Sequence, residues 1–514
     1  MPKTNSNALR HLIGSLTKAE KRHFKLYAKR NFGDKDLKFL ILFDLYDRGN
    51  ELDNSHLKKK LPGTKGSSLS NLKSHLYEQL LISLRLLHHN DPSIRIDELI
   101  SFSKVLYTKG LYFQSLNQLY KARNIAETYQ DDLAMYTINH MERKIELFFV
   151  TESGPNQAEN IVEKNNELRA ILKSSDEWSN VAIRLYDYYL KYGHVKNQRQ
   201  FRKVAIIFKD ETSKIDTSEM SVRSKVYQHM AYTWFHFITQ SFVLCYKHGC
   251  AWIEEMKANP VLLKEDPIIY LKGLHNVLSA LFYSNKPKQF ESYYLQLNSF
   301  IEEHSESFDF NTNLMARIYH YIARLNHRFI NGNFRNNEAF RSELAEWLSS
   351  NDSYIDTNRI QVFYYKIACM HFGADEFKAS VQVLNKIIHS ETKEHHLRQD
   401  VQCFARILNL VAHYELGNHE LVEYQLKSTY RFLIKYGDLQ EVQKLIIAFI
   451  RKSVHMNRNE MTPHFIELRT NLIAIFEDPF ERRPLLYLDL ISWLTSRIEN
   501  KPVETIIRQR QLSR

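Results

Sequence analysis

Residues 97–129 read DELISFSKVLYTKGLYFQSLNQLYKARNIAETY and predict two helices joined by a tight turn. Leu99, Phe102 and Leu106 have the spacing of one apolar helix face. Gly110 then interrupts the pattern, as glycine does at the end of many helices. Beyond it, apolar residues return at helical spacing at Tyr112, Leu116, Leu119, Ala122 and Ile125. The stretch therefore predicts an antiparallel helical hairpin.

The residues around this turn resemble the tetratricopeptide repeat (TPR), a helical hairpin with small residues at set positions. Ser103 precedes Gly110 by seven residues, and Ser115 follows it by five. The same pattern returns in 363–388, FYYKIACMHFGADEFKASVQVLNKII, and in 410–426, LVAHYELGNHELVEYQL. The resemblance implies an all-α solenoid, in which the first helix of every hairpin faces a concave groove.

Hairpins of the same kind are expected along most of the chain. We expect the turns near Gly110, Gly154, Gly193, Thr239, Asn285, Gly332, Gly373, Gly417 and Asn457. Their mean spacing of about 43 residues exceeds the 34 of a standard TPR. The repeats are therefore expected to be irregular, TPR-like or HEAT-like, with helices of about 15–18 residues.

Three regions are predicted. Residues 1–92 form a basic N-terminal helical domain, residues 93–480 form the array of about nine hairpins, and residues 481–514 form a C-terminal capping helix with a solvated basic tail. Residues 1–92 contain 17 basic and 9 acidic residues, and residues 497–514 contain 5 and 2. The rest of the chain is balanced, so the net charge of +11 lies at the two ends. Basic ends favour a polyanion or an acidic protein as partner.

The N-terminal domain is expected to hold four helices. Thr17 and Glu20 have the spacing of a capping box, and helices are predicted to about Arg30, over 36–47, over the stretch SHLKKKL and from about Ser67. The last two weakly resemble a helix-turn-helix or winged-helix DNA reader, although the linking PGTKGSS is longer than the usual turn. The candidate polyanion contacts are Lys58, Lys59, Lys60, Lys65, Asn71 and Lys73. A helical cap that seals the first repeat needs no special arrangement of the lysines and is expected first, and nucleic-acid contact is the alternative.

The predicted groove carries mainly aromatic and aliphatic residues, which suit a helix or peptide segment of another protein. Carried over from the TPR pattern, the candidate groove residues are Lys104, Tyr107, Tyr365, Lys366, Phe372, Phe404 and Tyr414. A further helix or the next superhelical turn could equally cover these positions. The function expected first is a protein-binding scaffold or adaptor, and the alternative is a nucleic-acid-associated regulator.

Composition and motifs exclude several other classes. With 14 Gly and 11 Pro in 514 residues, the chain has too few turn-formers for a β-rich fold. No HExxH, GxSxG, GxGxxG or paired CxxC motif occurs, so no enzyme, metal site or cofactor is expected. The longest apolar run is far short of a membrane span, and the four cysteines lack metal-ligand spacing. A cytoplasmic protein without membrane insertion is expected.

Overall fold

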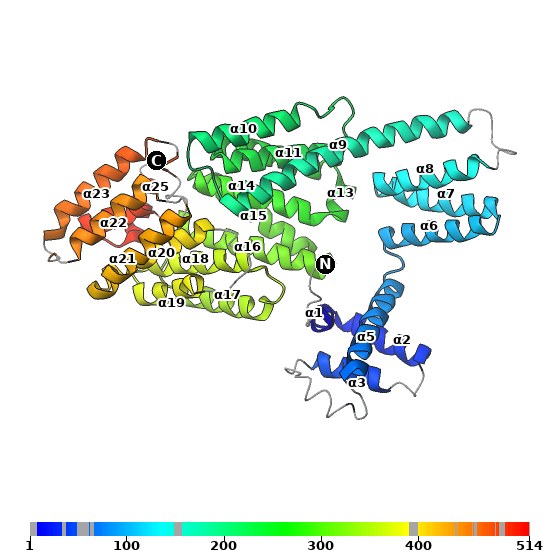
Figure 1. Cartoon of the computed structure of the whole chain (residues 1–514), viewed down its shortest axis with the longest axis horizontal. Coiled ribbons are helices and arrows are strands. Elements are labelled where there is room, and N and C mark those ends of the chain that lie inside the picture. The colour runs from blue at the N-terminus through cyan, green and yellow to red at the C-terminus, as the bar shows by residue number, and fades with distance from the viewer. Residues whose placement is uncertain are drawn as a thin grey trace. The chain divides into compact units, whose positions relative to one another are not determined.

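The structure is a computed structural model of the whole chain (Figure 1). It describes residues 8–32, 37–48, 61, 66–148, 157–389, 399–436, 439–454, 456, 460–478, 480–482 and 489–512. Within these ranges the chain forms 24 α-helices and no strand, which confirms the all-α, solenoid-like prediction. The helices divide into two compact units, Met1–Ala170 and Ile171–Arg514, and the division falls inside helix α9 (Gln157–Tyr192).

The first unit has two hydrophobic cores. One contains Phe24, Phe43 and Leu76, and the other contains Leu99 and Leu119. Its other helices are α1 (Ala8–Ser15), α2 (Lys18–Phe32), α3 (Leu37–Asp47), α5 (Gly66–Leu87), α6 (Pro92–Thr108), α7 (Tyr112–Thr128) and α8 (Asp132–Glu146).

The predicted capping box starts α2. The Thr17 amide donates to Glu20 Oε2 at 2.7 Å, and the Glu20 amide donates to Thr17 Oγ1 at 3.2 Å. The predicted helices over 36–47 and from Ser67 correspond to α3 and α5. The short helix expected over SHLKKKL falls almost wholly outside the described residues.

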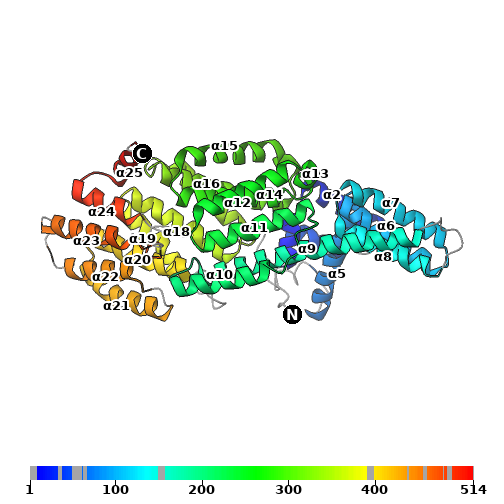
Figure 2. The same cartoon turned by 90° about the horizontal axis from the view of Figure 1, so that it is seen from above.

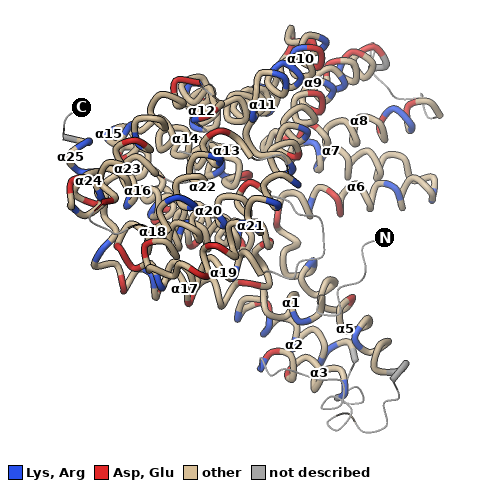
Figure 3. The backbone as a smooth tube through the Cα atoms, turned by 60° about the vertical axis from the view of Figure 1, so that its left-hand side comes forward, with Lys and Arg blue, Asp and Glu red and all other residues tan. Residues whose placement is uncertain are grey.

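The second unit is a succession of hairpins in which first helices pack on one another (Figures 1 and 2). Helix α11 contacts α14, α14 contacts α16, α16 contacts α18, and α18 contacts α20. Second helices fill the intervals, because α12 packs on α14, α15 on α16, and α19 on α20. Basic and acidic residues are interspersed along these helices (Figure 3), which agrees with the balanced charge of this part of the sequence.

The helices of the second unit vary in length around four to five turns. The bounds are α10 (Gln198–Thr212), α11 (Val222–Ile238), α12 (Phe242–Lys257), α13 (Pro260–Glu265), α14 (Pro267–Tyr283), α15 (Pro287–His304), α16 (Phe310–Ile330), α17 (Glu338–Asn351), α18 (Thr357–Gly373), α19 (Phe377–Ile388), α20 (Gln399–Glu415), α21 (His419–Lys435), α22 (Glu441–Ser453), α23 (Met461–Ile475), α24 (Leu490–Glu499) and α25 (Val503–Leu512).

One turn geometry recurs between the helices of a hairpin. A residue with left-handed backbone follows the first helix, and the next amide donates to the carbonyl five residues earlier, as Leu111 does to Leu106 at 3.0 Å. Glycine occupies the left-handed position at Gly110, whereas Gln240 takes it after Thr239 with φ 61°. The structure confirms the predicted turns at Gly110, Gly193, Thr239, Asn285, Gly332, Gly373 and Gly417. Gly154 and Asn457 lie outside the described residues.

Small residues let the paired helices approach closely, as predicted. Ser115 Oγ lies 2.8 Å from Ser103 Oγ and donates to the Ser103 carbonyl at 2.9 Å. In the same way, Ser380 Oγ donates to the Ala368 carbonyl at 2.9 Å. All four residues are fully buried. These contacts fix the register of α6 on α7 and of α18 on α19.

Contacts between distant parts of the second unit tie the start of its array to later repeats. The Gln440 side chain donates to the Lys196 carbonyl at 3.0 Å, and Lys196 Nζ donates to the Tyr436 carbonyl at 3.4 Å. A Cβ on Gly193 would lie 3.2 Å from Asp400 Oδ2. The turn between α9 and α10 therefore touches the start of α20 and the connection between α21 and α22.

The C-terminal segment is a docked helix, which corrects the expected solvated tail. Val503, Ile506 and Ile507 of α25 are buried. Glu504 Oε1 accepts the amides of Phe334 at 2.8 Å and Arg335 at 2.6 Å, in the turn after α16. Ile506 and Ile507 stand beside arginines in the sequence, and together with Val503 they form the apolar face that docks. The boundaries of the three predicted regions stay predictions.

Candidate functional site

The predicted polyanion contacts fall partly outside the described residues. Lys58, Lys59, Lys60 and Lys65 lie there, and their arrangement stays a prediction. Asn71 is exposed on α5, and Lys73 is partly buried on the same helix. Their role in binding a polyanion also stays a prediction.

Helix α2 carries a basic stripe that the sequence analysis did not single out. Its residues are Lys18, Lys21, Arg22, Lys25 and Lys29, which line one shallow depression with Leu26 and Asp47. Lys21 pairs with Asp47 at 2.7 Å, and Lys25 pairs with Asp44 at 2.8 Å. Lys18, Arg22 and Lys29 form no ion pair with any residue that the structure describes. In KAEKRHFKLYAKR these basic residues recur at intervals of 3, 4 and 7 positions, and this spacing alone indicates that they share one helix face.

Three of the predicted groove residues are core residues, which corrects the expectation for them. Tyr365, Phe372 and Phe404 are 5%, 4% and 2% exposed, and they pack in the core that α18 and α20 share with their neighbours. Helix α20 is buried along most of its length, so Phe404 is covered by the neighbouring helices. The alternative of a self-covered groove therefore holds at these positions.

The other predicted groove residues remain at least partly accessible. Lys104 is exposed, and Tyr107 is partly buried with Lys144 Nζ 4.6 Å from its ring centre. Tyr414 is partly buried, and its ring lies 5.8 Å from that of Phe449. Lys366 lines a cavity described next. The structure does not bring Lys366 and Tyr414 into one cavity among those described.

A cavity of about 390 Å³, here called the cationic pocket, lies on the first helices of the second unit. Its walls come from α9, α11, α14, α16 and α18, together with the residue that caps α18. The polar residues that concern its chemistry are Lys272, His275, Asn276, Tyr319, Asn326, Asp356, Arg359 and Lys366. Three of these are basic and one is acidic, so the pocket has an excess of positive charge.

Lys272 is the central cation of this pocket. It lies on the apolar helix α14, with its Nζ 5.1 Å from the ring centre of Tyr186 and 5.8 Å from that of Trp234. It makes no ion pair or hydrogen bond with the residues that the structure describes. Burial, with a smaller contribution from Arg359, lowers the pKa of Lys272 to about 8. The two ring faces offset only part of the cost of desolvating the ammonium group.

Helix α18 supplies the other two cations. Lys366 Nζ donates to Asn326 Oδ1 at 2.7 Å and lies 5.3 Å from the ring centre of Phe282. Arg359 pairs with Asp356 at 2.8 Å, one helical turn away. Because Asp356 also caps α18 by accepting the Arg359 amide at 3.0 Å, its charge is shared between two donors.

His275, Tyr319 and Asn276 complete the polar lining. The rings of His275 and Tyr319 stack at 4.6 Å. Burial, together with Arg359, Lys366 and Lys272, lowers the pKa of His275 to about 3, so this imidazole is neutral at pH 7. Burial raises the pKa of Tyr319. Asn276 is 6% exposed, and its Nδ2 has no hydrogen-bond acceptor in the part of the chain that the structure describes. Lys272 and Asn276 Nδ2 thus present donors that no described residue satisfies in this pocket.

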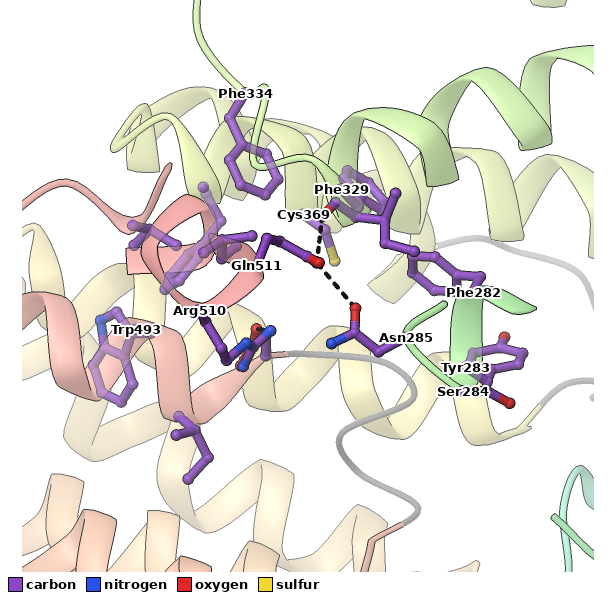
Figure 4. Close-up of a pocket in the computed structure, with 17 residues that line it drawn as sticks. Phe282, Tyr283, Ser284, Asn285, Phe329, Phe334, Cys369, Trp493, Arg510 and Gln511 are labelled. Carbon is purple, nitrogen blue, oxygen red and sulfur yellow. Dashed lines mark hydrogen bonds and ion pairs between the residues drawn. The ribbon is translucent and has the colours of Figure 1, made fainter. Parts of the chain in front are cut away.

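A second cavity, of about 600 Å³, lies beside α25 and is mostly apolar (Figure 4). Gln511 Nε2 donates to Asn285 Oδ1 at 3.0 Å and to the Ile330 carbonyl at 2.8 Å. Trp493 lies across the cavity from Phe282 in Figure 4, and Phe372 is in its wall. The C-terminal helix therefore covers the ends of α14, α16 and α18, next to the cationic pocket.

The sequence held one signal for the cationic pocket. Lys272 is the single charged residue in PIIYLKGLHNVLSALFY, the sequence of α14. A lone cation in an otherwise apolar helix is a poor core residue, and it indicates a site where the charge is used. Arg359 and Trp234 carry no comparable local pattern, because only the fold brings α11 and α18 to the same cavity.

The described residues contain no cluster of three or more His, Cys, Asp or Glu side chains that could hold a metal ion. None of the described helices has the length and hydropathy to cross a membrane. Comparison with protein-family models, curated proteins and solved structures finds no match for this chain.

Proposed function

We propose that the chain is a non-catalytic, TPR-like protein-binding scaffold of the cytoplasm, and that the cationic pocket receives part of a partner protein. The observation that carries the proposal is that the pocket walls come from first helices, α9, α11, α14, α16 and α18. These helices form the ligand-facing surface in solenoids of this kind. The burial of Tyr365, Phe372 and Phe404 restricts the proposed surface to this part of the second unit.

Energetics support a binding role. A partly buried ammonium without a carboxylate partner costs stability, and a ligand that brings negative charge would offset that cost. Aromatic rings of Tyr186, Trp234 and Tyr283 line the same cavity, and such rings dominate the energetics of protein interfaces. A scaffold needs this kind of preformed, rigid surface.

Site-specific photocrosslinking tests the proposal. A photoreactive amino acid replaces Asn358, which lines the pocket and is partly exposed, and a matched variant carries it at Tyr424, which is 75% exposed on α21. We expect a discrete covalent adduct in cells of the source organism from position 358 and none from position 424. The adduct at position 358 should disappear when Val362→Glu is added, because this substitution places a carboxylate of similar volume among the cations that would bind the partner. Equal adducts at both positions, or none at position 358, would contradict the proposal.

The α2 stripe supports a second candidate, the nucleic-acid-associated regulator. Lys18, Arg22 and Lys29 form no ion pair with a described residue and recur on one helix face, as phosphate contacts do. Retention of the intact protein on random duplex DNA, measured as salt rises, tests this candidate. A steep, linear loss of log affinity with log salt is expected for phosphate contacts, whereas no retention at low salt leaves the helical-cap interpretation of residues 1–92.

A further inference from the structure

The charge inside the cationic pocket is not balanced by its own lining. Lys272, Arg359 and Lys366 face the cavity, and Asp356 is the one acidic residue among its described walls. Asp356 is already engaged by Arg359 at 2.8 Å and by the N-terminus of α18. The described lining therefore carries more positive than negative charge, and Lys272 is the cation in it that pairs with no described acceptor. His275 lines the same cavity, and burial, together with smaller contributions from these three cations, lowers the pKa of its ring.

The neutral polar groups point to the same ligand chemistry. Asn276 Nδ2 is buried without an acceptor, and Lys272 has three N–H donors and no acceptor among the described residues. A ligand that satisfies them must bring oxygen acceptors as well as negative charge. A carboxylate brings one charge and two oxygens, whereas a phosphomonoester at pH 7 brings a charge of about −1.5 to −2 and three oxygens.

We propose that the cationic pocket binds the phosphate group of a phosphomonoester carried on an aromatic or apolar body. Lys272 and Lys366 contact the phosphate oxygens as mobile point charges, and Arg359 supplies a planar donor pair. Tyr186, Trp234 and Met315 in the same walls hold the apolar body. The cavity of about 390 Å³ is within the range of small-ligand sites. This inference rests on the proposed function, because it names the group of the partner that the pocket recognises.

The ester has two possible sources, a phosphorylated side chain of a protein and a free phosphorylated metabolite. Both present the same dianion to the three cations. The sources differ in what surrounds the phosphate, since a protein segment would also contact the first helices beside the pocket.

Isothermal titration with phenyl phosphate as probe tests the inference on the full chain at pH 7 and low salt. We expect saturable binding to the wild type and an affinity at least about tenfold lower for Lys272→Met and Lys366→Met. Lys288→Met, at an exposed position on α15, is the control and should bind as the wild type does. Phenyl sulfate has the same shape with a single charge, and it should bind at least about fivefold more weakly.

Three results would overturn the inference: no binding at up to about 10 mM phenyl phosphate, equal affinity for phenyl sulfate, or unchanged affinity in both lysine variants. If any of these results is obtained but position 358 still crosslinks to a partner, the scaffold function is supported and the phosphate inference is rejected. To separate the sources, phosphotyrosine within a short peptide is compared with phenyl phosphate. Tighter binding of the peptide indicates a phosphoprotein, and tighter binding of the free ester indicates a metabolite.

Discussion

The Ser380 hydroxyl donates to the main-chain carbonyl of Ala368 at 2.9 Å, so α18 and α19 touch with no side chain between them at that point. Both residues are fully buried, so a larger side chain at position 368 would meet neighbouring protein atoms instead of solvent. The contact explains why a small residue stands at each of these positions, because a longer side chain would push the helices apart.

The Ala368→Leu variant is expected to lose about 1–3 kcal/mol of unfolding free energy, because the added atoms overpack this crossing. Urea denaturation followed by circular dichroism measures the loss. Ala448→Leu, at an exposed position on α22, is the matched control and should change stability by less than about 0.5 kcal/mol. A variant at position 368 as stable as the control would show that the helices do not cross as described.

Gly417 and Gly332 both have a left-handed backbone, but replacing them by alanine should lower the unfolding free energy by different amounts. Gly417 (φ 72°) has no atom within 4 Å of an added Cβ, so Gly417→Ala should cost only the left-handed backbone penalty of about 1 kcal/mol. In Gly332→Ala (φ 60°), the new Cβ would lie 3.0 Å from the Glu504 carbonyl oxygen and 3.2 Å from Ile507. We expect the second variant to lose more stability.

The variants Gly417→Ala and Gly332→Ala also test whether α25 is docked as described. Limited proteolysis should release the C-terminal residues faster from Gly332→Ala than from Gly417→Ala, because only position 332 contacts α25. Similar melting temperatures and similar cleavage rates for the two variants would contradict the docked position of this helix.

Removing the charge of Lys272 should stabilise the free protein. Lys272→Met keeps the apolar stem against Tyr186 and Trp234 and relieves the desolvation cost, so we expect a gain of about 1 kcal/mol in unfolding free energy. Lys288→Met is the control and should be neutral. A lower melting temperature for Lys272→Met than for the control would show that the ammonium group stabilises the fold.

The stability that Lys272→Met gains over the wild type should decrease as pH rises. Burial lowers the pKa of Lys272 to about 8 in the folded chain, whereas in the unfolded chain its pKa is near the ordinary lysine value of 10.5. Between these values the unfolded chain binds more protons, so the wild type gains stability as pH rises. The advantage of Lys272→Met is therefore largest below pH 8 and shrinks towards pH 10.5. Chemical denaturation at several pH values measures it, and a difference that grows with pH would refute the assignment.

Two sets of lysine and arginine substitutions separate the surfaces that could hold a polyanion. One variant replaces Lys18, Arg22 and Lys29 by Gln, and the other replaces Lys58, Lys59, Lys60 and Lys73. The control replaces the exposed Lys378, Lys427 and Lys452. If DNA or RNA binds, each lost phosphate contact should flatten the slope of log affinity against log salt by about 0.9. We expect the α2 variant to have the larger effect per residue, because its three cations recur along one helix face.

The sequence was sufficient for the fold but only partly for the site. Turn residues and helical periodicity around Gly110 and Gly417 are local signals, so the hairpins followed from them. The left-handed Gln240 shows that the turn persists without glycine, since the apolar pattern on both sides selects it. Burial of Phe404 could not be predicted, because it depends on how α20 is surrounded by later helices. The cationic pocket joins α9 to α18, and no local pattern encodes that proximity.

The hydrogen bonds from Gln440 to Lys196 and from Gln511 to Asn285 affect the order in which parts of the second unit can fold. A plain array of hairpins gains stability one neighbour at a time and can unfold from either end. Here residues 244 and 226 positions apart must meet, so the last helix is needed to complete contacts made by the early ones. During synthesis, the early hairpins would wait for α25 to emerge before this unit reaches full stability. Deleting α25 should therefore turn one cooperative transition into several.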